Sequence, residues 1–318
     1  MFTFLKNWTL PVAIAVGTVC YLLFAFTPSL DAAGDALLPV FETLLPLTIF
    51  MTLFVTFSKV DFHRMRLHRW QAVVLLLQLL LVVIFMGLIL QLTSQKLLLE
   101  AVLICIIAPC ASASPVVTAK LGGDLTQMTT FVLLSSLVAS VLIPAVFPVL
   151  EPHEGLTFLS AFLVILRRLA TVLLLPLLLG AIVRHWVKPL YDWFLRTPDL
   201  GFYLWSVSLS ITAGITVRNI LHSRASLALL LAIAFFTLLT AIVQFRLGRA
   251  VGRAYGEHIC TGQAMFQKNT GLAIWIAYVY LTPIASIGAG CYVLWQNIIN
   301  SLELWQHHKK TACPHPHL

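Results

Sequence analysis

Two long apolar segments are interrupted near their middle, one by Ile107-Ala-Pro-Cys-Ala-Ser-Ala-Ser-Pro115 and the other by Gly262-Gln-Ala-Met-Phe-Gln-Lys-Asn-Thr-Gly271. Pro109 and Pro115 remove backbone donors and clash with the preceding helical turn. Gly262 and Gly271 are expected to break the second segment, whose polar side chains are Gln263, Gln267, Lys268, Asn269 and Thr270. Polar groups and unwound backbone persist at membrane depth only where they are paired, buried in protein or lining a cavity. The pattern therefore predicts two discontinuous helices that meet around a polar site, although Pro109 alone is also compatible with a simple kink.

The composition excludes a soluble protein. Hydrophobic residues make up 60% of the 318 residues, charged residues make up only 10%, and the mean hydropathy is +0.95. Soluble domains carry roughly 25% charged residues. These values rule out soluble enzymes, nucleic-acid-binding proteins and disordered chains. They predict an all-α polytopic protein whose solvent is the lipid bilayer.

A helix needs about 20 residues to cross the hydrocarbon layer. Ten segments meet this requirement: 9–28, 36–58, 70–93, 99–119, 127–149, 165–185, 201–222, 226–246, 258–280 and 283–305. The connections between them are short, and no soluble domain is expected. An even number of spans places both termini on the same side of the membrane.

The basic residues orient these predicted spans. Of the 20 Lys and Arg residues, 14 fall on the side of the termini and five on the opposite side, while Lys268 falls within a span. Cytoplasmic loops carry an excess of Lys and Arg. We therefore expect a multi-pass protein of the cell (inner) membrane with both termini in the cytoplasm. The same bias accounts for the net charge of +8 without a nucleic-acid partner.

The loop that follows residue 150 divides the ten predicted spans into five and five. An odd number of spans in each half gives the two halves opposite orientations, as in an inverted repeat. The expected halves are residues 1–150 and residues 151–318. The two interrupted segments are then the fourth helix of their respective halves, which is where such folds place a substrate site near the midplane.

These features favour a secondary transporter over the other classes of membrane protein. The chain has no GxxxxGK[ST] motif for nucleotide binding. It also lacks the HExxH and GxSxG motifs typical of several enzyme classes, so we do not expect an enzyme. A membrane-embedded enzyme and a channel remain the alternatives. Saturable uptake with counterflow would distinguish a carrier from either of them.

At these residues the sequence resembles the bile acid:sodium symporter family and its bacterial relatives. The segments that carry the resemblance are Pro109-Cys-Ala-Ser-Ala-Ser114, Gly123-Asp124, Pro144, Asn269-Thr-Gly-Leu-Ala273 and Val293-Leu-Trp-Gln-Asn297. Gln78 matches a family glutamine that helps to bind sodium. The resemblance implies ten helices in a panel domain and a core domain, with the fourth and ninth spans crossing in the core. It also implies alternating-access transport of organic anions (bile acids, sulfated steroids or carboxylate metabolites), usually with two sodium ions.

The sequence departs from the family pattern at the sodium ligands. Pro115 stands where the family has an asparagine, and Met128 and Val132 replace hydroxyl residues. Proline, methionine and valine side chains offer no hard oxygen ligand. The family's Glu-x-Gly-x-Gln-Asn motif is also broken. An ungapped comparison places Lys268 at the glutamine, whereas a one-residue insertion aligns Gln263 and Gln267.

We hypothesise that Lys268 supplies the positive charge that sodium provides elsewhere and that it loads and releases a proton. The alternatives are a lysine that snorkels to the membrane interface, a fixed ion pair, for example with Glu42, or a retained sodium dependence. The candidate substrate- and ion-binding residues are Gln78, Ser112, Ser114, Gln263, Gln267, Lys268, Asn269, Thr270 and Asn297. No cofactor and no defined metal site are expected, and either sodium or a proton is a possible coupling ion. The expected partners are a small organic anion and the bilayer, in a monomer or a homodimer.

Overall fold

All the regular elements are helices. The computed structural model describes residues 8–151 and 157–312, and within these ranges it contains no β-strand. The all-α class is therefore confirmed. Five helices are long and apolar enough to cross a membrane: α2 (Thr9–Phe26), α4 (Arg69–Gln91), α7 (Leu125–Leu150), α11 (Leu200–Leu221) and α12 (Leu227–Tyr255).

The other predicted spans coincide with helices that are divided, bent or more polar. The divided ones are α5 (Lys96–Ile107) with α6 (Ser114–Lys120), α8 (Phe158–Leu169) with α9 (Leu175–Trp186), and α13 (His258–Phe266) with α14 (Thr270–Tyr280). A π-helical turn over Ala170–Leu174 joins α8 to α9. The two remaining helices are α3 (Asp31–Ser58) and α15 (Pro283–Ala312), and α15 is the more polar of these. Interruption accounts for the three divided pairs, and polarity accounts for α15; of α3, the described part contributes a shorter apolar helix over Thr43–Ser58.

One helix, α10 (Lys188–Arg196), was not predicted, because this segment was treated as a connection between two spans. Its sequence has a proline at the start, where the missing N–H costs nothing. Phe194 is buried and packs edge-on against Phe54, with 5.5 Å between the ring centroids. A helix of nine residues is too short to cross a membrane, so hydropathy over a long window does not detect it.

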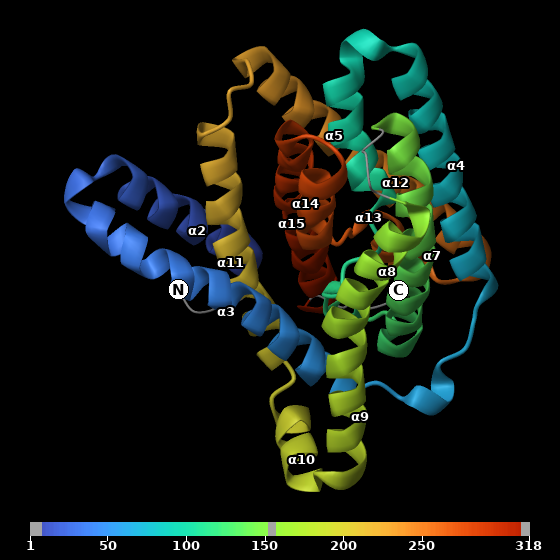
Figure 1. Cartoon of the computed structure of the whole chain (residues 1–318). Coiled ribbons are helices and arrows are strands. Elements are labelled where there is room, and N and C mark those ends of the chain that lie inside the picture. Colours follow the sequence, from blue (N-terminus) through green and yellow to red (C-terminus); the bar gives the residue numbers. More distant parts are fainter. Residues whose placement is uncertain (1–7, 152–156, 313–318) are drawn as a thin grey trace.

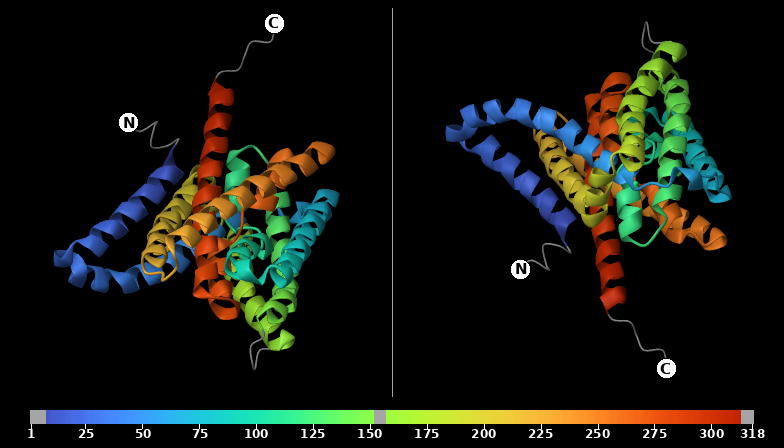
Figure 2. Two further views of the ribbon diagram at one scale, coloured as in Figure 1. Left: turned by 90° about the horizontal axis from the view of Figure 1, so that it is seen from above. Right: turned by 90° about the horizontal axis from the view of Figure 1, so that it is seen from below.

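The helices form two groups (Figures 1 and 2). In the first group, α11 packs against α2 and α3, and α3 packs against α9; the α2–α3 hairpin extends away from the rest of the molecule. In the second group, α5 packs against α4, α12 and α15, while α13 lies on α12 and α14 lies on α15. The joined helices α8 and α9 connect the groups, because α8 packs on α7 and α9 packs on α3.

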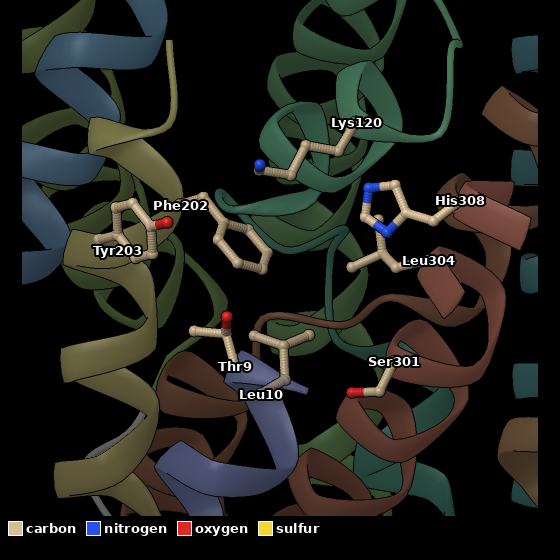
Figure 3. Close-up of a pocket in the computed structure, with 8 residues that line it drawn as sticks. All are labelled: Thr9, Leu10, Lys120, Phe202, Tyr203, Ser301, Leu304 and His308. Atoms are coloured by element: carbon tan, nitrogen blue, oxygen red, sulfur yellow. The ribbon is translucent and has the colours of Figure 1, made fainter. Parts of the chain in front are cut away.

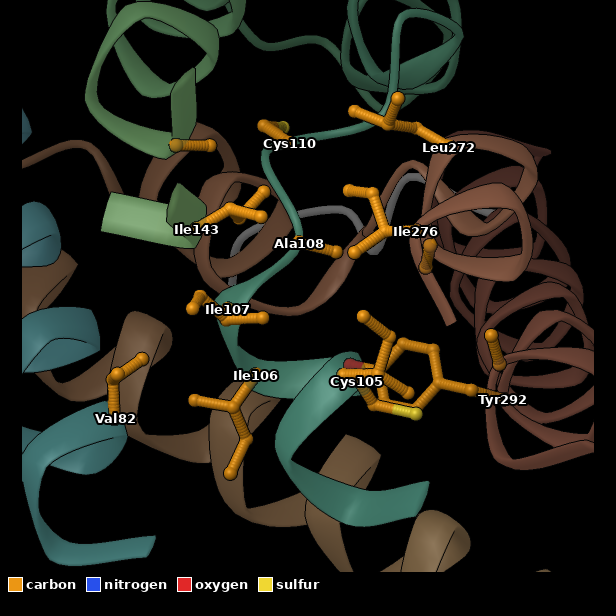
Figure 4. Packing of buried hydrophobic residues seen from close by; sticks show 14 of the residues in the cluster. Val82, Cys105, Ile106, Ile107, Ala108, Cys110, Ile143, Leu272, Ile276 and Tyr292 are labelled. Atoms are coloured by element: carbon orange, nitrogen blue, oxygen red, sulfur yellow. The ribbon is translucent and has the colours of Figure 1, made fainter. Parts of the chain in front are cut away.

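The largest buried apolar cluster lies in the second group and surrounds the end of α5 (Figure 4). Ile106 and Ile107 point into it together with Val82, Ile143 and Ile276, which come from α4, α7 and α14. This apolar cluster surrounds the interrupted backbone, which is therefore enclosed by protein. Such enclosure is the condition under which non-helical backbone is tolerated at membrane depth.

Candidate functional site

The first interruption separates α5 from α6. Helix α5 ends at Ile107, and residues 108–113 are not helical. Pro109 lies in this non-helical segment, whereas Pro115 lies in the first turn of α6. A proline in the first turn is favourable because its missing N–H has no helical partner there. Pro109 therefore breaks the helix and Pro115 restarts it.

The second interruption covers Gln267, Lys268 and Asn269, between α13 and α14. The side-chain Oδ1 of Asn269 accepts a hydrogen bond from the backbone N–H of Leu272 at 3.1 Å. Such an N-cap satisfies a donor that a new helix leaves free. Asn269 thus fixes the point at which the chain becomes helical again.

The prediction that Gly262 and Gly271 break the ninth span is wrong. Gly262 lies inside α13, and Gly271 lies in the first turn of α14. A Cβ atom on Gly262 would approach the side chain of Arg249 on α12 to 3.2 Å. Small residues let membrane helices pack closely, which explains a helical glycine here.

The two interruptions pair with each other as a short antiparallel bridge between Cys110 and Lys268. The backbone N–H of Ala111 donates to the carbonyl of Gln267 at 2.8 Å, and that of Asn269 donates to the carbonyl of Pro109 at 2.9 Å. Buried backbone groups that leave a helix need such partners. Each interrupted segment therefore provides hydrogen-bond partners for backbone groups of the other.

Side chains from α4 and α15 satisfy further backbone groups at the crossing. The amide nitrogen of Gln78 lies 3.0, 3.3 and 3.1 Å from the carbonyl oxygens of Ile106, Ile107 and Ala108. The hydroxyl of Tyr292 donates to the carbonyl of Phe266 at 2.6 Å. Gln78, predicted as an ion ligand, thus caps the broken end of α5 through its amide nitrogen, and its Oε1 atom has no hydrogen-bond partner.

The side chain of Gln296 forms two hydrogen bonds with the backbone of the second interruption, as a neighbouring strand would. Its Oε1 accepts from the backbone N–H of Lys268 at 2.9 Å, and its Nε2 donates to the carbonyl of Lys268 at 3.3 Å. Tyr292 and Gln296 were not among the predicted site residues, although Gln296 lies in the segment Val293–Asn297 that carries the family resemblance. Their spacing of four residues within an apolar span, which puts them on one helix face, was the available signal.

We expect Gln78→Leu to destabilise the protein, because the carbonyls at the end of α5 would lose their donor in a buried position. The loss is about 1–3 kcal/mol for a buried unsatisfied group. The midpoint of thermal unfolding in detergent measures it. Gln91→Leu is the matched control, because Gln91 lies in the same helix and is exposed. Equal midpoints for the two variants would contradict the capping role.

Lys268 lies at the centre of the crossing and is 1% exposed. Its Nζ atom has no hydrogen-bond partner and no ion-pair partner among the described residues. Lys268 and Glu100 are the only charged side chains among the buried residues of the described chain. The side chain of Glu42, named as a possible partner of Lys268, lies outside what the structure describes.

The helices that meet at the crossing carry buried acceptors that lack donors. Buried side-chain oxygens without a hydrogen-bond partner are Gln78 Oε1, Gln244 Oε1, Gln263 Oε1, Gln267 Oε1 and Asn297 Oδ1. Each such group is costly to leave unpaired. A lysine ammonium carries three donors and no acceptor. The crossing therefore combines a buried ammonium with several buried amide oxygens that lack a donor.

The remaining predicted residues lie in or close to the two interruptions. Ser114 lies at the crossing, where its hydroxyl donates to the carbonyl of Ala111 at 2.7 Å. Thr270 is the first residue after the second interruption, and its backbone N–H donates to the carbonyl of Lys268 at 2.9 Å. Ser112 is buried in the first interruption. Gln263 bonds to Asn300 at 3.0 Å, one helical turn before the second interruption.

The last positions of the site are Asn297 on α15 and the α7 residues that replace the family's sodium ligands. Asn297 uses its amide nitrogen within its own helix, donating to the carbonyl of Val293 at 2.7 Å. Met128 and Val132 on α7 are fully buried. The oxygen that α7 does provide, Ser135 Oγ, accepts from the backbone N–H of Cys110 at 3.1 Å. Ser135 was not predicted, because nothing in the sequence of α7 distinguishes it from Ser136 and Ser140 in the same helix.

A small cavity lies at the end of the molecule where α2 begins, between the two groups of helices (Figure 3). Lys120 from α6, Phe202 from α11 and Ser301 from α15 are among the residues that line it. Lys120 forms an ion pair with Asp199, and its Nζ lies 4.4 Å from the centre of the Phe202 ring. None of the predicted site residues lines this cavity.

Comparison with known proteins identifies the family. The model of the sodium bile acid symporter family matches residues 44–250, which is more than half of the chain. The match includes Gln78 and the first interruption, and it ends before the second. None of the curated proteins compared with the chain matches it. The protein therefore belongs to the sodium bile acid symporter family, whose members are membrane transporters.

Proposed function

We propose that this protein is a secondary transporter of a small organic anion, in which Lys268 is a fixed positive charge that replaces bound sodium. The observation that supports this most directly is the buried ammonium at the crossing, together with buried amide oxygens that lack a donor on the helices that meet there. A buried charge without a counter-charge is strongly unfavourable. A carboxylate or sulfate on the solute supplies that counter-charge when it binds.

The degenerate sodium ligands support the same proposal. Pro115, Met128 and Val132 stand where side-chain oxygens would be needed, and all three are buried. No apolar side chain of this kind ligates sodium. A transporter that carries its own cation at the crossing does not require the ion for the anion to bind.

The proposed topology has ten spans in two inverted halves, residues 1–150 and 151–318. The interrupted helices α5–α6 and α13–α14 are then the fourth span of each half. The excess of Lys and Arg on one side supports cytoplasmic termini in the inner membrane. Such folds work by alternating access around a fixed midplane site.

In this proposal the two groups of helices described above move relative to each other. The ion pair between Lys120 and Asp199 links them near the termini, because Lys120 follows the first interruption and Asp199 precedes α11. Opening on that side requires this contact to break.

Uptake into proteoliposomes tests the proposal, with taurocholate and a 2-keto acid as probe anions. We expect saturable uptake with counterflow, at the same rate in sodium and in choline medium. Strict sodium dependence would instead support the second candidate, a sodium-coupled symporter of the same solutes, which family membership favours. Linear, non-saturating flux would point to a channel. A thermal-shift screen of organic anions narrows the solute class, because a bound ligand raises the unfolding midpoint by mass action.

A further inference from the structure

A second buried charge lies at the opposite end of α5 from the crossing. The side chain of Glu100 is 0% exposed, and neither of its carboxylate oxygens accepts a hydrogen bond from a donor in the described chain. Glutamate is almost never fully buried unless it is paired. Glu100 has no part in the crossing, so its burial needs a separate explanation.

The nearest cation is shared with another carboxylate. The Nζ atom of Lys96 lies 2.5 Å from Glu151, 3.2 Å from the carbonyl of Leu150 and 3.9 Å from Glu100. The contact with Glu100 is too long for a hydrogen bond. Glu151 and Leu150 thus accept the close hydrogen bonds of the Lys96 ammonium. This single positive charge faces two carboxyl groups.

The other helices packed on α5 do not provide the missing charge. In α14 and in the first half of α15, which packs on α5 at Ala101, the described ionisable side chains are Tyr280, Cys291 and Tyr292, which are neutral acids at neutral pH. Glu303 and the His and Lys residues that follow it lie at the far end of α15. The basic residues of α4 and α12 lie at the far ends of those helices, beginning with Arg69 and Arg246. Glu151 follows α7 directly and adds repulsion. Two carboxylates beside one ammonium leave a net negative charge in a buried position.

We propose that Glu100 is a proton-binding site, which shares one proton with Glu151 beside Lys96 at the end of α5. Protonation removes the uncompensated charge, and two carboxyl groups that share a site hold one proton far more firmly than an isolated carboxyl does. The side chains of Lys96 and Glu151 are 34% and 29% exposed, so the proton reaches water through them. Resting on the proposed function, this proton is the coupling ion that the transporter carries together with the anion in place of sodium.

Infrared titration of the full chain in lipid tests the site without any solute. The wild type should show the carbonyl stretching band of a protonated carboxylic acid at neutral pH. Glu100→Gln, which imitates the neutral acid, should lose this band and still fold. Glu257→Gln removes a carboxylate elsewhere and should keep it. Absence of the band in the wild type, or its persistence in Glu100→Gln, would overturn the proton site.

Taurocholate uptake under an inward proton gradient tests the coupling. The gradient should drive accumulation severalfold above equilibrium in the wild type, whereas Glu100→Gln should retain exchange and lose the accumulation. Equal accumulation by both proteins would overturn the coupling role. If the wild type moves no taurocholate, the proposed function fails for this anion, and the infrared band still decides whether Glu100 holds a proton.

Discussion

Lys268→Gln is expected to lower uptake of the transported anion by about 10- to 100-fold, the range that follows from losing a hydrogen bond to a charged group. The substitution keeps a polar side chain and removes the positive charge at the crossing. The backbone of residue 268 should remain in place, because Gln296 and the bridge to Cys110 hold it through main-chain groups. The loss should therefore appear in transport and anion binding, with little effect on folding.

The measurement is initial uptake into proteoliposomes as a function of anion concentration. Lys309→Gln is the matched control, since Lys309 is exposed near the end of α15. Lys268→Gln in sodium medium adds a second readout. Recovery of uptake by sodium would show that the ion re-enters the place of the ammonium. Uptake by Lys268→Gln at the wild-type rate in choline would show that the charge has no role.

Gly288→Ala should be among the most destabilising single substitutions in this chain, although it adds one methyl group. A Cβ atom on Gly288 would lie 2.2 Å from the carbonyl oxygen and 2.8 Å from the Cβ of Ala101. The obstacle is backbone, which cannot rotate aside, and α5 is also held at its other end by Gln78. Overpacking of this kind costs about 3 kcal/mol or more when the backbone has to move.

Gly87→Ala is the control with the opposite sign. A Cβ atom on Gly87 meets nothing within 4 Å, and alanine favours the helix over glycine by about 1 kcal/mol. Thermal unfolding in detergent should therefore give a lower midpoint for Gly288→Ala and an equal or higher one for Gly87→Ala. Similar midpoints would mean that α5 and α15 can separate at little cost.

The prolines made the first interruption predictable, whereas the second was predicted in the right segment and at the wrong residues. Pro109 has a local steric effect that acts in any context. Gly262 has no such effect, because a glycine in a helix breaks it only if nothing else favours helical geometry. Packing of α13 against α12 does favour it, and that packing is a tertiary property.

The residues that hold the crossing were the least predictable part of the site. Gln296 and Tyr292 act on backbone groups of residues that are far away in the sequence. Nothing in the sequence of α15 reveals which carbonyl or amide they will meet. Glu100 was missed for a related reason: its burial depends on the contacts that α5 makes with other helices, which periodicity alone does not show.

The bridge between Cys110 and Lys268 has a consequence for how a solute crosses the membrane. Since the two unwound segments complete each other's hydrogen bonds, neither can slide past the other without exposing bare amides to hydrocarbon. The two segments should therefore behave as one rigid unit. In the proposed transporter, access would then be switched by the helices around this pair, and the anion would be released when its surroundings change while its binding groups stay together.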